Sequence, residues 1–80
     1  MDNNTIEAAV VRIIASTIHV EEERVTPDLS IGEIPEWDSM GNLSIIAALE
    51  SQLDVEFPME DLFELTSVKN IINEIKTIKK

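Results

Sequence analysis

Apolar residues recur at helical spacing in three separate segments, and this periodicity limits the possible fold more than any other feature of the chain. Such spacing places apolar side chains on one face of an α-helix. Residues 53–57 alternate with a period of two, but a single isolated strand has no sheet to join. The sequence therefore predicts an all-α fold. The three apolar stripes are Ile6, Val10, Ile13, Ile14 and Ile18; Ile45, Ile46, Leu49 and Leu53; and Val68, Ile71, Ile72, Ile75 and Ile78.

Capping residues set the expected ends of the first two helices. Asn4 can cap the first helix, with Glu7 as the return partner of a capping box, and the apolar pattern fades near His19. The second helix is expected to start at Asp38 or Ser39. Aspartate is a strong N-cap, and its negative charge suits the positive end of the helix dipole.

The last part of the chain predicts a short helix followed by a longer one. Pro58 suits the first position of a short helix over residues 59–65, whose anchor candidates are Leu62, Phe63 and Leu65. Thr66 or Ser67 is expected to cap the final helix. The result is a bundle of three longer helices and one short third helix, in a single domain over residues 1–80.

A long loop is expected between the first and second helices, over residues 20–37, because no helical or strand period persists there. Apolar residues within this loop are expected to pin it to the core, with a short helical turn. Trp37 either packs beneath the loop or flanks an arm attached to Ser39, and packing is preferred because large aromatic residues usually bury their area. The pinning residues are Val25, Leu29, Ile31 and Ile34.

The charge is strongly one-sided. The net charge is −10, and residues 25–68 contain no lysine or arginine. Such a surface repels the phosphates of nucleic acids and of anionic membranes, and it favours basic protein partners. No segment approaches membrane-spanning length, so a soluble, cytoplasmic, monomeric protein without membrane insertion is expected.

Most site chemistries are excluded by the residue types present. The chain has no cysteine, which excludes disulfides and zinc–thiolate centres. His19 is the only histidine and lies near the end of the first expected helix, and the sequence has no Gly-x-Ser-x-Gly motif, so no catalytic residues are expected. The acidic residues do not follow the spacing of a calcium-binding loop, and no metal site is expected.

Ser39 is the residue that carries a functional hypothesis. It lies in the run Pro35-Glu36-Trp37-Asp38-Ser39-Met40-Gly41, at an expected helix start where backbone N–H groups lack acceptors. A phosphodiester on its oxygen would find those donors, and Gly41 would let another molecule approach it closely. The alternative is that Asp38 and Ser39 form only a double cap.

The motif Asp38-Ser39-Met40-Gly41 resembles the Asp-Ser-Leu motif of acyl carrier proteins, with Met40 in place of the usual leucine. The resemblance extends to nearly the whole chain and is closest to the free-standing bacterial type. That family places its serine at the start of the second helix after a long loop. The later matching elements are Leu49-Glu50, residues 54–56, Phe57-Pro58 and Thr66-Ser67-Val68.

This resemblance implies a four-helix acyl-carrier-like bundle and a covalent cofactor, 4′-phosphopantetheine, on Ser39. A phosphopantetheinyl transferase would attach it from coenzyme A with magnesium, and Asp38 would cap the helix and present the serine. Acyl-loading and acyl-transferring enzymes with basic docking surfaces are the implied partners. The chain would be a non-catalytic carrier of thioester-linked acyl groups.

The expected partner surface is less acidic on the second helix than in fatty-acid carriers, which favours a specialised biosynthetic pathway. Fatty-acid synthesis and aminoacyl or peptidyl carriage remain alternatives. So does a helical interaction module without a prosthetic group. Met40 and Leu43 could instead be partly buried against the loop. The candidate partner-binding residues are Met40, Leu43, Ala47, Glu50, Asp54, Glu60 and Asp61.

Overall fold

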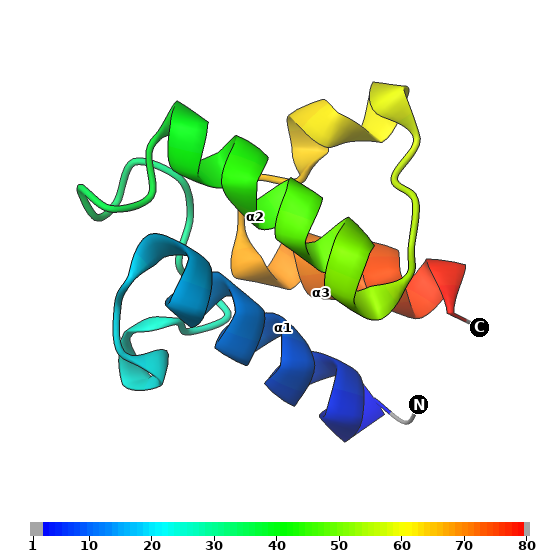
Figure 1. Ribbon diagram of the computed structural model, residues 1–80, viewed down its shortest axis with the longest axis horizontal. Helices are drawn as coiled ribbons and strands as arrows, with labels where there is room; N and C mark the ends of the chain where they lie inside the picture. Colours follow the sequence, from blue (N-terminus) through cyan, green and yellow to red (C-terminus); the bar gives the residue numbers. More distant parts are fainter. Residues whose placement is uncertain (1–2, 80) are drawn as a thin grey trace.

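The fold consists of three α-helices and two 3₁₀-helices in a computed structural model that describes the backbone of residues 3–79 and the side chains of residues 5–79. Helix α1 packs against both α2 and α3, and η2 lies beside α2 away from α1 (Figure 1). The all-α prediction is confirmed. In chain order the elements are α1 (Asn3–Ile18), η1 (Glu22–Arg24), α2 (Ser39–Leu53), η2 (Met59–Glu64) and α3 (Val68–Ile78).

The core forms where the apolar faces of the three α-helices meet. All five predicted residues of the α1 stripe are buried, and α2 and α3 bury theirs except near their C-terminal ends. There, Leu53 is only partly buried and Ile78 is 38% exposed. The final turns of both helices therefore extend beyond the shared core.

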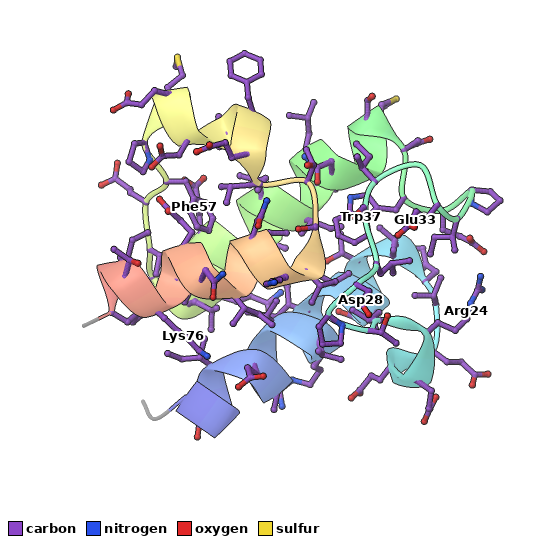
Figure 2. All side chains as sticks on the ribbon, turned by 180° about the vertical axis from the view of Figure 1, so that it is seen from behind. Arg24, Asp28, Glu33, Trp37, Phe57 and Lys76 are labelled. Atoms are coloured by element: carbon purple, nitrogen blue, oxygen red, sulfur yellow. The ribbon has the colours of Figure 1, made fainter. Side chains whose placement is uncertain are left out.

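The start of α1 differs from the expected cap. The helix already includes Asn3 and Asn4, so the prediction that Asn4 precedes the first turn is wrong. The observed start differs from the predicted start by a short displacement, which is typical of helix ends. The expected side-chain bond of Asn4 lies outside the described side chains. Glu7 instead pairs with Lys76 of α3 at 3.6 Å, and Figure 2 shows Lys76 beside α1.

Helix α1 ends in a left-handed turn. His19 has φ 61°, and the Val20 N–H donates to the Ala15 carbonyl oxygen across 3.0 Å. This is the bond pattern of a Schellman C-cap. It turns the chain out of α1 and into the long loop.

The loop between α1 and α2 is fixed to the rest of the fold at several points. Val25 and Leu29 are buried, while Ile31 and Ile34 are partly buried against the core, which confirms the predicted pinning. The Ile31 N–H donates to the Thr66 carbonyl oxygen at 2.8 Å. The Val68 N–H donates to the carbonyl oxygen of Leu29 at 3.0 Å. The loop is thereby held against the start of α3.

The short third helix is a 3₁₀-helix, and it uses fewer anchors than expected. Leu65 is buried, and Leu62 is partly buried against the core. Phe63 is 88% exposed, so its prediction as an anchor is wrong. In a 3₁₀-helix, side chains three residues apart lie on the same side. Leu62 and Leu65 share the inner side, and Phe63 points away from it.

Within residues 3–79, no helix combines the length and the apolar character that a bilayer crossing requires.

Candidate functional site

Ser39 is the first residue of α2, and its side chain is exposed. Asp38 has an extended backbone and caps the helix: its carboxylate accepts the Gly41 N–H across 2.7 Å. The carbonyl oxygen of Asp38 accepts the Asn42 N–H at 2.8 Å. The Ser39 hydroxyl makes no hydrogen bond to the described residues. Asp38 therefore caps α2 alone, and the double cap is not formed.

The residue before the cap is buried and bonded. Trp37 has none of its surface exposed, which confirms that it packs beneath the loop. Its indole N–H donates to the side-chain oxygen of Asn42 at 2.9 Å (Figure 2 shows Trp37 where the loop meets α2). Its carbonyl oxygen accepts the Gly32 N–H at 2.8 Å. The segment that leads to Ser39 is therefore bonded both to α2, through Asn42, and to the loop, through Gly32.

Glycine is required at position 41 for a different reason from the one expected. A Cβ at this position would lie 2.9 Å from the Glu36 carbonyl oxygen and 3.3 Å from the Asp38 carboxylate. The protein's own loop fills the space next to Gly41, which corrects the expectation that this glycine opens the approach to Ser39. Glycine is needed here so that the loop can approach the first turn of α2 closely.

A groove of about 390 Å³ opens beside Ser39, between α2 and η2. Its volume lies within the range of small-molecule sites, and most of its lining is apolar. No sequence pattern indicates this groove, because it forms only where the loop, α2 and residues 59–66 meet. The lining residues are Ile31, Ser39, Asn42, Leu43, Met59, Leu62, Phe63 and Thr66.

The expected partner residues at the start of α2 are freely accessible. Met40 is 78% exposed and Leu43 is 68% exposed, so neither is partly buried against the loop. Ala47 is exposed on the same helix. Leu43 lines the groove with Ser39. The outer face of α2 near Ser39 is therefore apolar.

The two acidic candidates near the end of α2 have structural roles. Glu50 is half-buried, and its carboxylate accepts the Phe57 N–H at 3.0 Å. Asp54 is exposed in the left-handed conformation with φ 54°, and its N–H donates to the carbonyl oxygen of Glu50. Neither residue lines the groove beside Ser39.

The two acidic candidates on η2 also lie away from that groove. Glu60 is exposed, and Asp61 lines a separate hollow with Glu64 and Glu74 of α3. The Asp61 carboxylate raises the pKa of Glu74, because it accepts a hydrogen bond from the protonated form of Glu74. Partial desolvation and repulsion by Asp61 and Glu64 raise this pKa further. Negative charge is thus concentrated on the side of η2 that faces α3.

The start of α2 suits an anionic group esterified to Ser39. The amide N–H groups of Ser39 and Met40 precede the first intrahelical donor, and neither donates to another of the described residues. The positive end of the helix dipole adds to this potential. A phosphodiester on the exposed Ser39 oxygen therefore fits the residues present.

Residues 8–75 match the family model described as "Phosphopantetheine attachment site". The matched range includes the whole of α2, the groove beside it and η2. Covalently attached 4′-phosphopantetheine is the cofactor of this domain, in agreement with the resemblance found in the sequence. The three α-helices, the short third helix and the match over most of the chain lead to one conclusion: this protein belongs to the phosphopantetheine-binding carrier family, which includes the acyl carrier proteins.

Proposed function

We propose that Ser39 is the attachment residue for 4′-phosphopantetheine and that the chain carries acyl groups for other enzymes. The observation that carries this proposal is the exposed, unbonded Ser39 hydroxyl at the first residue of α2. Asp38 holds the first turn through its bond to Gly41. The hydroxyl is thus held at a defined place and is accessible to a second protein.

Attachment requires a phosphopantetheinyl transferase, the enzyme class that modifies carriers of this family. The Ser39 oxygen forms the new bond to the phosphorus of the phosphopantetheinyl group of coenzyme A, adenosine 3′,5′-bisphosphate leaves, and the hydroxyl proton passes to a base. The N–H groups of Ser39 and Met40 would hold the new phosphodiester. When bound, the cofactor supplies the thiol that holds an acyl group as a thioester.

The carrier is proposed to be non-catalytic and to act as a cytoplasmic monomer in a specialised pathway. Carriers of this family generally perform no chemistry of their own. Support for a specialised pathway comes from α2, whose only acidic residue, Glu50, uses its carboxylate on the Phe57 N–H. Support for an acyl rather than an aminoacyl cargo comes from the apolar groove that reaches Ser39.

The attachment residue is tested by intact mass. Apo protein is incubated with coenzyme A, magnesium and a broad-specificity transferase, together with Ser39→Ala and Ser51→Ala variants. Ser51 is an exposed serine of the same helix and serves as the matched control. Wild type and Ser51→Ala should each gain one phosphopantetheinyl group, and Ser39→Ala should gain none. No gain by folded wild type would favour the interaction module instead.

The pathway is tested by loading. Modified protein is incubated in parallel with the loading and elongation enzymes of fatty-acid synthesis and with amino-acid adenylating enzymes. The specialised-pathway proposal expects poor loading by both sets. Efficient elongation by the fatty-acid enzymes would reject it, and efficient aminoacylation would replace the acyl cargo with an amino acid.

A further inference from the structure

We propose that Met40 is a redox-sensitive modification site, where a peroxide converts the thioether to a sulfoxide and thereby slows attachment at Ser39. This inference rests on the proposed function, because it concerns the regulation of the same attachment residue. Met40 follows Ser39 directly in α2, and 78% of its surface is exposed. Hydrogen peroxide can therefore reach the sulfur atom while Ser39 is still unmodified.

Sulfur in the described part of the chain is confined to the neighbourhood of Ser39. The sequence has no cysteine and three methionines, of which Met40 and Met59 lie within the described residues. Met59 is also 78% exposed, and it lines the groove that contains Ser39. Trp37, another side chain that oxidises readily, is fully buried. Within residues 3–79, a peroxide thus meets accessible sulfur only next to the attachment residue.

Oxidation of Met40 would change the surface and leave the core intact. Neither Met40 nor Met59 belongs to the hydrophobic core or packs against it. A sulfoxide inside a core disrupts packing, whereas a sulfoxide at the surface replaces a flexible apolar group by a polar, chiral one. We therefore expect oxidation to alter what can approach Ser39 and to leave the melting temperature unchanged.

The new oxygen would lie on the residue next to the one that must react. A transferase that brings coenzyme A to Ser39 has to cover the first turn of α2, and it thereby removes water from the side chain of residue 40. A sulfoxide oxygen that loses its water without gaining a hydrogen-bond donor weakens this contact. The thioether carries no such cost, because it is apolar.

The oxidation step balances with hydrogen peroxide as the oxidant. The Met40 sulfur lone pair attacks one peroxide oxygen, the O–O bond breaks and an S–O bond forms. Sulfur loses two electrons, and the peroxide is reduced by them. The hydroxide that leaves takes the proton of the transferred hydroxyl group and becomes water. A thiol-dependent methionine sulfoxide reductase reverses the change, so the modification is suited to regulation.

The alternative is that Met40 serves only as a flexible apolar contact. Leucine has a similar volume and has no sulfur to oxidise. Met40→Leu therefore separates the reactivity of the sulfur from the shape of the side chain. Met59→Leu is the matched control, since it removes the other described methionine, which is equally exposed.

The test treats apo wild type, Met40→Leu and Met59→Leu with dilute hydrogen peroxide, and catalase then removes the excess. Intact mass counts the oxygen atoms gained, and peptide masses assign each of them to its methionine. Every sample is next incubated with coenzyme A, magnesium and a broad-specificity transferase. The kcat/KM of each treated sample is compared with that of the same protein left untreated, which removes any effect of the substitution itself.

We expect peroxide to lower kcat/KM about tenfold for wild type and for Met59→Leu, which both keep Met40, and to leave it unchanged for Met40→Leu. A methionine sulfoxide reductase should restore the treated wild type. Met40→Gln carries a polar group of similar size and should be modified slowly without any peroxide. The melting temperature of oxidised wild type should equal that of the untreated protein.

The outcomes distinguish this inference from the proposed function. No oxygen on Met40, or an oxidised Met40 with unchanged kcat/KM, would overturn the inference while attachment at Ser39 stands. An equal fall for Met40→Leu would overturn it by placing the effect at another residue, and a lowered melting temperature would overturn it by placing the effect in the fold. Absence of mass gain by untreated wild type would reject the attachment residue itself, and its regulation with it.

Discussion

The indole N–H of Trp37 donates to the side-chain oxygen of Asn42 across 2.9 Å, and this bond spans the segment that contains Asp38 and Ser39. Trp37 is fully buried, so its N–H has no access to water. Asn42 also donates its backbone N–H to the Asp38 carbonyl oxygen. The exposed serine is therefore attached to the core through the residues on either side of it.

Replacing Asn42 by alanine is expected to destabilise the fold by about 1–3 kcal/mol, the cost of leaving a buried donor without an acceptor. Urea unfolding measures this loss directly, since Trp37 is the only tryptophan and its fluorescence reports its own burial. The same change should slow modification of Ser39, because the first turn of α2 loses its attachment to the loop.

Gln52→Ala is the matched control for Asn42→Ala, as it removes an exposed amide from the same helix. It should change the free energy of unfolding by less than about 0.5 kcal/mol. If Asn42→Ala is equally mild, the bond from Trp37 does not hold the start of α2.

The features that the sequence predicted correctly depend on residues close together in the chain. The stripe from Ile6 to Ile18 is an α-helical repeat, and the Asp38 cap needs only the N–H of Gly41 three residues later. Such local relationships do not depend on how the rest of the chain folds. For this reason the helices and the position of Ser39 at the start of α2 followed from pattern alone.

The features that were missed depend on how distant segments meet. Whether Gly41 faces solvent or the Glu36 carbonyl oxygen is decided by the path of the loop, which no local pattern specifies. Phe63 lies in a six-residue 3₁₀-helix, too short for a periodicity that would tell its inner side from its outer side. Likewise, the bond between Glu50 and Phe57 exists only because the chain folds back after α2.

Gly41→Ala tests the close approach of the loop. Alanine is favoured over glycine in a helix by about 1 kcal/mol, so an open position would gain stability. Here the added Cβ would lie 2.9 Å from a backbone oxygen, and overpacking of this kind costs about 1–3 kcal/mol. We expect a net loss of stability in urea unfolding and slower modification of Ser39.

Ser44→Ala provides the comparison, since Ser44 is exposed on the same helix and alanine there adds no contact. It should leave stability unchanged or slightly raised. A Gly41→Ala protein more stable than wild type would show that the loop moves away at no cost.

Glu74→Gln tests the proximity of Glu74 on α3 to Asp61 on η2. The pKa of Glu74 is raised in the folded protein by the neighbouring Asp61, so the folded state binds the extra proton more tightly than the unfolded state. Its contribution to stability is therefore present at low pH and is lost as the pH rises through the raised pKa. At neutral pH, Glu74→Gln should stabilise the protein by about 0.2–1 kcal/mol, the range for exposed charge pairs.

The measurement is the free energy of unfolding of wild type and Glu74→Gln between pH 4.5 and pH 7.5. The advantage of the variant should shrink as the pH falls and Glu74 of the wild type takes up its proton. Glu56→Gln removes one exposed acidic charge from the loop before η2. It should change the free energy of unfolding less than Glu74→Gln does, and this change should depend less on pH. An advantage for Glu74→Gln that grows toward acidic pH would reverse the sign argued here.

Substitutions of Glu50 distinguish a structural role from a docking role. Glu50 was expected at the partner surface, yet its carboxylate accepts the Phe57 N–H within the protein. Glu50→Ala removes the acceptor of the Phe57 N–H and should cost about 1.5–3 kcal/mol, as expected for a bond to a charged group. Glu50→Gln keeps an acceptor oxygen and should recover part of that loss. Neither change should raise the KM of a phosphopantetheinyl transferase for the folded protein. A KM raised equally by alanine and glutamine, with stability unchanged, would instead mean that the charge of Glu50 faces the partner.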